Sequence, residues 1–396
     1  MLSIKAQTSS KDEARYFREH LSHDDYYSDR QATPGRWFGR TCGVLGLDSQ
    51  APVEQADFVA LCKGLRPDDG TRLTQRASPR RRCVYDLTLS APKYVSIMAL
   101  LARDERIIAA HESAVIVALE AAEKLAAVRV RRGEAADSRQ SRQTCNIVAA
   151  LFTHGESRAL DPQLHTHGVT FNVTHDPTEQ RLKALEARPF YDQARSLTQL
   201  YRAHLTESLH ALGYDTYEDR YHCPQIHGVS PKLMGRFSKR SGQRDALVAL
   251  KQQELGRPLT KGEVAQVIHQ NRTKKQRHVD PEALRRMQLE QLAPEDRLSL
   301  DHLKAQALAN PQPGQDRPFV PRRLPGFAPG PEAGWVAALR VALLMTRAVN
   351  LDCYLFSPAV SFPEQVLRAA RFMRQVERTA SVARYAQRSR QLSPSR

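Results

Sequence analysis

The sequence contains no uninterrupted apolar run of about 18 residues, the length that a membrane-spanning helix needs. Its N-terminal stretch, MLSIKAQTSSKDEARYF, has no apolar signal region. The six cysteines are scattered and form no C-x-x-C pair, which argues against a zinc knuckle or a disulfide framework. These absences predict a protein of the reducing cytoplasm without membrane insertion.

Acidic residues are also few. Asp and Glu number 43 against 59 Lys and Arg, which gives a net charge of +16. Such an excess favours a polyanionic partner, either a nucleic acid or an anionic membrane surface, although a merely solvated basic surface is the ordinary alternative. The chain contains no G-x-x-x-x-G-K-[ST] phosphate loop, so we do not expect it to hydrolyse ATP.

The first part of the chain mixes strand and helix patterns. Strands are predicted over 83–90, 145–154 and 164–174, and amphipathic helices over 105–131 and 191–213. Together they predict an α+β domain over 1–230, with a central antiparallel β-sheet and helices packed behind it.

The second part is helical and basic. Residues 231–295 are expected to form helices, with the dense basic segment NRTKKQRH at 271–278. Residues 296–334 are predicted to be a Pro-rich linker, and 335–396 are an unassigned, partly disordered C-terminal segment.

The stretch LDPQLHTHGVTFNV carries two histidines in an alternating pattern. In a strand His165 and His167 lie on one face, and apolar residues continue on that face behind them. If the preceding strand pairs with this one as an antiparallel hairpin, His154 comes near both. Three neutral imidazoles can hold a divalent metal ion and leave open positions for a phosphoryl group, although histidines at a strand end can equally be surface residues.

Two further residue types bear on this site. Asp86, on a neighbouring predicted strand, could accept a hydrogen bond from a metal-ligating imidazole and fix its tautomer, or could be an ordinary edge-strand residue. Tyr16, Tyr26 and Tyr27 lie near the N-terminus, and a tyrosine hydroxyl can attack phosphorus. Ring packing in a polar helix is the alternative for these tyrosines.

The ordered set of these motifs resembles a known family. DPQLHTHGVTFNV with FTHGESR upstream resembles the HUH endonucleases, and within them the TrwC/TraI-like, MobF-type conjugative relaxases. YDLTLSAPKYVSIMALLARDERIIAAH, DDYY, ALGY and GRFSKRSGQ resemble further segments of the group, so that the resemblance covers about residues 1–295.

The resemblance implies a strand-specific DNA nickase that binds single-stranded and hairpin DNA at an origin of transfer and forms a covalent 5′-phosphotyrosine. It also implies that the basic helices over 231–295 cover the bound DNA as a lid. It implies Tyr16 as the initiating nucleophile and Tyr26, beside Tyr27, for a second transfer. It also implies that His154, His165 and His167 hold Mg²⁺ or Mn²⁺, with Zn²⁺ as an alternative, and that Asp86 orients a histidine. A type IV secretion coupling protein, accessory transfer proteins and passage into the recipient cell on the DNA belong to the same expectation.

Two alternatives stay open. The first cluster has Phe17 after Tyr16 where the family has a second tyrosine, which leaves room for an inactive relative that only binds DNA. A rolling-circle replication initiator is the other alternative, but such proteins usually place the tyrosine after the H-x-H motif, whereas here it precedes the motif.

Overall fold

The computed structural model describes residues 1–8, 35–75, 81–130, 140–219, 223–271 and 281–311. The three tyrosines of the sequence argument, most of the basic segment 271–278 and the whole segment 335–396 therefore lie outside the described residues. No described helix has the length and apolar content to cross a membrane.

A five-stranded sheet forms the centre, in the order β1-β3-β7-β6-β2, and each neighbouring pair is antiparallel. Its strands are β1 (Leu2–Thr8), β2 (Arg36–Phe38), β3 (Arg82–Ser90), β6 (Ala149–Glu156) and β7 (Pro162–Phe171). The predicted antiparallel sheet and α+β class are confirmed. β3 and β7 are interior strands of the sheet. β3 is buried from Cys83 to Leu89, as the dense apolar pattern of CVYDLTL requires, and β7 is buried over its last four residues.

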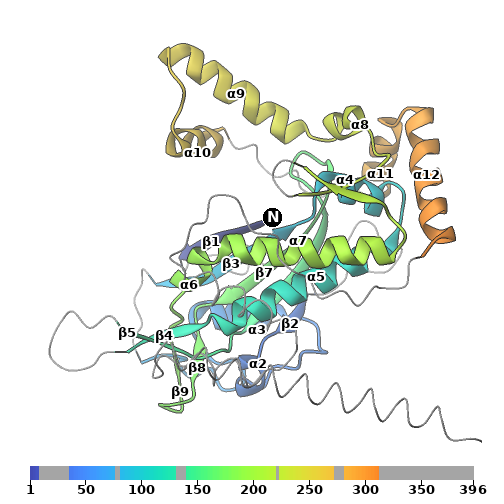
Figure 1. The fold of residues 1–396 in the computed structure, drawn as a ribbon. Coiled ribbons are helices and arrows are strands. Elements are labelled where there is room, and N and C mark those ends of the chain that lie inside the picture. The colour runs from blue at the N-terminus through green and yellow to red at the C-terminus, as the bar shows by residue number, and fades with distance from the viewer. Residues whose placement is uncertain (9–34, 76–80, 131–139, 220–222, 272–280, 312–396) are drawn as a thin grey trace, which may run out of the picture. The chain divides into compact units, whose positions relative to one another are not determined.

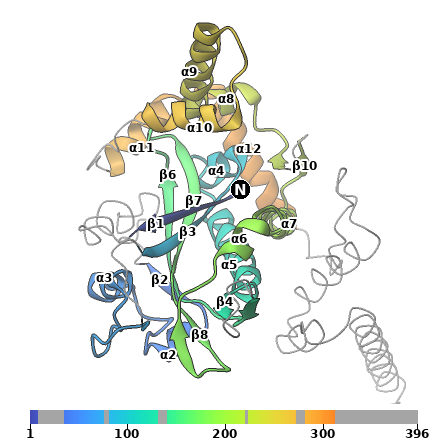
Figure 2. The ribbon, with the colours of Figure 1, turned by 90° about the vertical axis from the view of Figure 1, so that its left-hand side faces the viewer.

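Helices cover one face of this sheet (Figure 2). They are α4 (Lys93–Leu100), α5 (Glu105–Lys124) and α7 (Ala194–Ala211), with the short α6 (Arg188–Asp192) before α7. Asp104 caps α5 by accepting from the Arg106 amide, and its carboxylate also accepts from the Tyr214 hydroxyl at 2.6 Å. The predicted end at residue 131 was wrong, because the alternating AVRV that follows α5 forms β4 (Ala127–Val130).

The opposite face carries an aromatic core. Phe171 of β7 contacts Phe58 of α3 (Gln55–Lys63), with ring centroids 5.2 Å apart, and Phe58 also meets Phe152 of β6 at 6.2 Å. Trp37 of β2 packs on Phe171 from the other side, and the short α2 (Thr41–Val44) adds to the same core. This core lies under the half of β7 that follows His165 and His167, and it anchors that strand.

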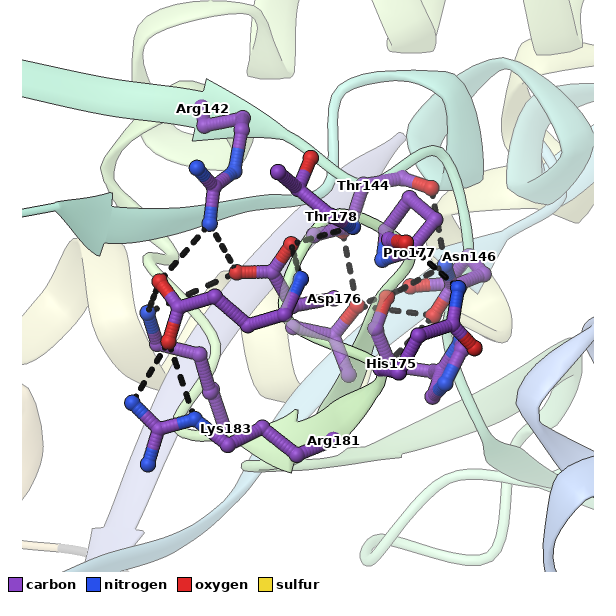
Figure 3. Close-up of polar contacts among 12 residues, drawn as sticks. Arg142, Thr144, Asn146, His175, Asp176, Pro177, Thr178, Arg181 and Lys183 are labelled. Carbon is purple, nitrogen blue, oxygen red and sulfur yellow. Dashed lines mark hydrogen bonds and ion pairs between the residues drawn. The ribbon is translucent and has the colours of Figure 1, made fainter.

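Three small hairpins extend from the sheet and its helices: β4 with β5 (Gln140–Gln143), β8 (Thr174–Asp176) with β9 (Arg181–Lys183), and β10 (Thr216–Glu218) with β11 (Pro224–Ile226). The β8–β9 hairpin, which follows β7, encloses a network of charges (Figure 3). Asp176 has no exposed surface and bonds Arg142, with Lys183 at 3.4 Å. Glu179 accepts from Arg142 at 2.8 Å and from Lys183 at 2.8 Å.

A helical segment follows, and part of it stands beyond the end of the sheet where β6 turns into β7 (Figure 1). Its helices are α8 (Pro231–Arg236), α9 (Lys239–Leu255), α10 (Lys261–Gln270), α11 (Pro281–Glu290) and α12 (Pro294–Ala309). Ser230 caps α8 by accepting from the Leu233 amide, and Thr260 with Glu263 forms a capping box before α10.

The predicted linker over 296–334 begins too early. Residues 294–309 form α12, which starts with a proline and two acidic residues and buries Leu300 and Ala307. Proline at the first helical position and acidic residues in the first turn favour a helix, so only the stretch after Ala309 can be a linker. Residues 312–334 lie outside the described part of the chain.

Candidate active site

The β6–β7 hairpin brings three histidines together. His154 of β6 lies directly opposite His165 of β7, and Phe152 lies opposite His167, so the parity that the sequence predicted is the observed register. The ring centroids are 5.4 Å apart for His154 and His165, 5.5 Å for His154 and His167, and 5.2 Å for His165 and His167. His154 is buried, whereas His165 and His167 are half-buried at the rim.

Two of these rings are oriented through Nδ1. His165 Nδ1 lies 2.9 Å from the carbonyl oxygen of Gln163, and His167 Nδ1 lies 3.0 and 2.9 Å from the two carboxylate oxygens of Asp86. Carbonyl and carboxylate oxygens can only accept, so Nδ1 must carry the proton in both rings. In the neutral imidazoles the lone pair is then on Nε2, the form in which a histidine binds a metal through Nε2.

The position and charge of Asp86 suit it to accept a hydrogen bond from His167. It lies on β3 opposite Val169, one diagonal step from His167, and Thr88 donates to its Oδ1 at 2.9 Å. Burial would raise the pKa of Asp86, but the imidazole of His167 and the hydrogen bonds from His167 and Thr88 outweigh it and hold the pKa below its usual value. The carboxylate therefore stays ionised and continues to accept from Nδ1.

The ring spacing fits one metal ion. Three imidazoles that ligate one ion tetrahedrally, with nitrogens about 2.1 Å away, place their ring centres about 5 Å apart, close to the spacing here. The nitrogens themselves are not yet aimed at one point: among the described residues no set of three His, Cys, Asp or Glu side chains is arranged to hold an ion as it stands. To close the set the rings would have to rotate about χ2, and such sp² torsions are soft.

Positive charge lies beside the histidines, and sequence reasoning assigned no role to it. Lys93, at the start of α4, donates to the carbonyl oxygen of Pro162 at 2.8 Å, and Pro162 is three residues before His165. Burial, helped by Arg240 and opposed by Asp161, lowers the pKa of Lys93 to about 8. The only local sequence feature that marks Lys93 is the stretch APK, which follows β3 and ends at this lysine.

The helical segment is tied to the turn of the same hairpin. The Lys239 amide donates to Asp161 at 2.9 Å, and the Gln288 amide group donates to the carbonyl oxygen of Leu160 at 2.7 Å. Gln288 and Asp161 are almost fully buried. Helices α9 and α11 therefore contact the loop that presents the histidines, and no local pattern in the sequence could have indicated these pairs.

The tyrosine-bearing segment connects β1 to β2 in the sequence, and only its C-terminal end meets the sheet near the histidines. It follows Thr8, the end of β1, and it ends before Gly35, where a methyl group would lie 2.2 Å from the ring of Phe152. Phe152 is the residue paired with His167. The positions of Tyr16, Tyr26 and Tyr27 themselves fall outside the described residues, and their roles stay predictions.

Comparisons with known proteins agree with this geometry. The family model described as TrwC relaxase matches residues 10–294. The "Multifunctional conjugation protein TraI" of Escherichia coli strain K12 is 38% identical over 225 residues, and a second Escherichia coli protein of that description is 36% identical over 225 residues. Each of these matches covers 54% of this chain but only 12% of the relative's length.

Solved structures are similar over most of the described fold. A copper-bound conjugative relaxase TrwC in complex with oriT DNA has a TM-score of 0.63 and 30% identity, over 76% of this chain and 98% of that chain. A TrwC complex with a 27-mer DNA that comprises the recognition hairpin and the cleavage site has a TM-score of 0.60 and 29% identity, with the same coverage. A metal-free TrwC complex with oriT DNA is also similar, with a TM-score of 0.61.

Proposed function

Because the chain belongs to the TrwC relaxase family, we propose that it is a conjugative relaxase, a site- and strand-specific DNA nickase and strand transferase acting at an origin of transfer. One observation carries the proposal. The hairpin that gathers His154, His165 and His167 also fixes two of the rings with Nδ1 protonated, so that their Nε2 lone pairs can face a ligand. Similar TrwC chains are described as bound to metal and to oriT DNA.

The three histidines would hold a divalent cation, Mg²⁺ or Mn²⁺ in first place and Zn²⁺ as the alternative. Such an ion supplies Lewis-acid polarisation of a non-bridging oxygen of the scissile phosphate. Asp86 keeps the His167 ring in its ligating tautomer and lends it negative charge. The protonated amine of Lys93 adds positive charge near the same end of β7, where a phosphate would be attracted.

The nucleophile would be a tyrosine oxygen. Tyr16 attacks the phosphorus, a bond between its phenolic oxygen and phosphorus forms, and the bond from phosphorus to the 3′ oxygen breaks. The proton lost by the phenol balances the one taken up by the leaving 3′-hydroxyl, and the 5′-phosphate remains on the tyrosine. Tyr26, with Tyr27 beside it, would serve the second transfer that recircularises the strand.

Chain length permits both tyrosine clusters to reach the histidines. Thr8 lies opposite Arg82, six strand positions from Thr88, the partner of His167, which is a distance of about 20 Å. The eight residues from Thr8 to Tyr16 can span up to about 26 Å. Tyr26 is nine residues before Gly35, which already lies against Phe152. The order of the two transfers therefore needs a test by mutation.

The excess positive charge would bind the DNA backbone. α9 carries Lys239, Arg240, Arg244 and Lys251 and has no buried residue, so its surface is available to a polyanion. Binding should weaken steeply as salt rises, because each neutralised phosphate releases counterions. A type IV secretion coupling protein, accessory transfer proteins, a cytoplasmic location and transfer into the recipient cell on the DNA are part of the same proposal.

The test uses labelled single-stranded oligonucleotides that carry candidate origins of transfer from the protein's own replicon, with Mg²⁺ or Mn²⁺. A covalent protein–DNA adduct on a denaturing gel is expected, lost on chelation. Tight binding to the hairpin without an adduct from any origin would instead favour the DNA-binding relative without activity.

The tyrosine assignment is tested in the same assay. Tyr16→Phe should abolish the first adduct, whereas Tyr26→Phe should leave it and impair strand rejoining. A Tyr16→Phe protein that forms the adduct at the full rate would assign initiation to the second cluster.

A further inference from the structure

A chain of buried polar groups lies behind the histidine strand, on the helix-covered face of the sheet. His111 of α5 has no exposed surface. Its Nδ1 lies 2.7 Å from the hydroxyl of Tyr201 on α7, and its Nε2 lies 2.9 Å from the hydroxyl of Thr166 on β7. Thr166 in turn lies 2.9 Å from the hydroxyl of Thr153 on β6.

The threonine end of this hydrogen-bonded series lies directly behind the candidate metal site, on the opposite face of the sheet. Thr166 is the residue between His165 and His167, and because side chains alternate in a strand it points to the opposite face. Thr153 pairs with Thr166 across the hairpin, and its neighbour His154 pairs with His165. The two hydroxyls therefore connect the strands that carry all three imidazoles, directly behind them.

Both ring nitrogens of His111 have hydrogen-bond partners. Apolar side chains could have filled the same core position, so the polar groups there call for an explanation. Desolvation, with the nearby His165 and the N-terminal amine in support, lowers the pKa of His111 to about 3, so its ring is neutral. A neutral ring donates through one nitrogen and accepts through the other, so the hydrogen bonds run in a single direction through the ring, either from Tyr201 to Thr166 or the reverse. A buried network of this kind specifies one arrangement of the groups that it joins.

We propose that His111 is a positioning residue: through Thr166 it fixes, from the reverse face of the sheet, the direction in which His165 and His167 leave β7. Asp86 and Gln163 set the rotation of those two rings on the front face. His111 sets the strand beneath them, since a shift or twist of Thr166 would move both neighbouring Cβ atoms together. This inference rests on the proposed metal site but not on the identity of the nucleophile.

The experiment measures the affinity of the full chain for Mn²⁺ by electron paramagnetic resonance without DNA, and separately its affinity for the origin hairpin. Thr166→Val keeps the shape and strand preference of the side chain and removes only the hydroxyl. It should weaken Mn²⁺ binding about tenfold, at the lower edge of what outer residues of metal sites contribute, and leave hairpin binding unchanged. Tyr201→Phe should act in the same direction and more weakly.

A matched control lies on the same two helices. Ser113 of α5 bonds His204 of α7 at 3.0 Å, but at the surface. Ser113→Ala removes a hydroxyl–imidazole bond between α5 and α7 without touching β7, so Mn²⁺ affinity should not change. Rescue adds a second readout: His111→Gln can still donate and accept and should keep most of the affinity, whereas His111→Leu should lose it even where its melting temperature is unchanged.

Equal Mn²⁺ affinity in the wild type, Thr166→Val and folded His111→Leu proteins would overturn the proposal. If His111→Leu does not fold, Thr166→Val alone decides. A wild-type protein that makes no phosphotyrosine adduct while the variants still lose Mn²⁺ affinity would overturn the nicking activity and support the positioning. A wild-type protein without Mn²⁺ affinity would overturn the positioning, and the adduct assay would still decide the nicking activity.

Discussion

The polar groups at the two ends of β7 are organised in opposite ways. Beyond the C-terminal end, each of the carboxylates of Asp176 and Glu179 is paired with cations from the set Arg142, Lys183 and Arg181 (Figure 3). Near the N-terminal end, the imidazoles of His165 and His167 are each held through Nδ1, by Gln163 and Asp86 respectively. The first arrangement is closed and stabilises a hairpin. The second orients ring nitrogens that a cation can use.

The largest contrast should come from the histidines. His165→Ala removes one of three proposed ligands, and we expect Mn²⁺ affinity and adduct formation to fall by at least about 100-fold. His175→Ala, a change at the saturated end, is the control and should leave both near the wild-type values. The two measurements are a metal titration and the adduct gel. Equal losses of Mn²⁺ affinity and adduct formation in the two variants would contradict the claim that only the histidine end of β7 binds the cation.

Asp176→Asn tests the saturated end. The variant removes the charge that faces Arg142 and Lys183 in a buried position, and we expect the free energy of unfolding to fall by about 2–3 kcal/mol. Thermal or urea unfolding measures this loss. Mn²⁺ affinity of the folded protein should not change, and a parallel loss of affinity would show that the ends are coupled.

Asp86→Asn is the matched change at the histidine end. An amide can offer its oxygen to His167 but carries no charge, so we expect metal affinity to fall about 10- to 100-fold with a smaller change in stability than in Asp176→Asn. The titration and the melting temperature are read on the same preparation. Wild-type affinity in this variant would mean that Asp86 is an ordinary buried acid.

The smallest effect concerns pH. Hydrogen bonds from Lys183, Arg181 and Arg142 lower the pKa of Glu179 from 4.5 to about 2. A lowered carboxyl pKa stabilises the fold above the unfolded value of 4.5, and this contribution is lost as pH falls toward 2. Glu179→Gln should therefore flatten the acid dependence of the melting temperature over that range, and less so at high salt because the group is at the surface. An unchanged acid dependence would contradict the pairing.

The front of the site was predictable from sequence because its signals are local. Alternation within LDPQLHTHGVTFNV and the position of His154 were enough to predict the hairpin, which the register confirms. To place Asp86 beside the histidines, only one further strand, the one over 83–90, had to be predicted. The back of the site was not predictable from sequence. His111 is 55 residues from Thr166 and 90 residues from Tyr201, and no local pattern joins them.

The errors at element ends have a similar cause. Apolar spacing after Lys124 suits a helix as well as a strand, and pairing with β5 decides for β4. α12 was taken into the linker because its neighbours are Pro-rich, although its own first turn has helix-starting residues. Contacts such as that of Gln288 with Leu160, which join the helical segment to the site, arise only from tertiary packing.

The central claim is that a cation binds the imidazole end of β7 and not its carboxylate end. Anomalous diffraction at the manganese edge from crystals soaked in Mn²⁺ tests it most directly. The account predicts one peak at ligating distance from a nitrogen of each of His154, His165 and His167, and none beside Asp176 and Glu179. A peak at those carboxylates with none at the histidines would contradict it.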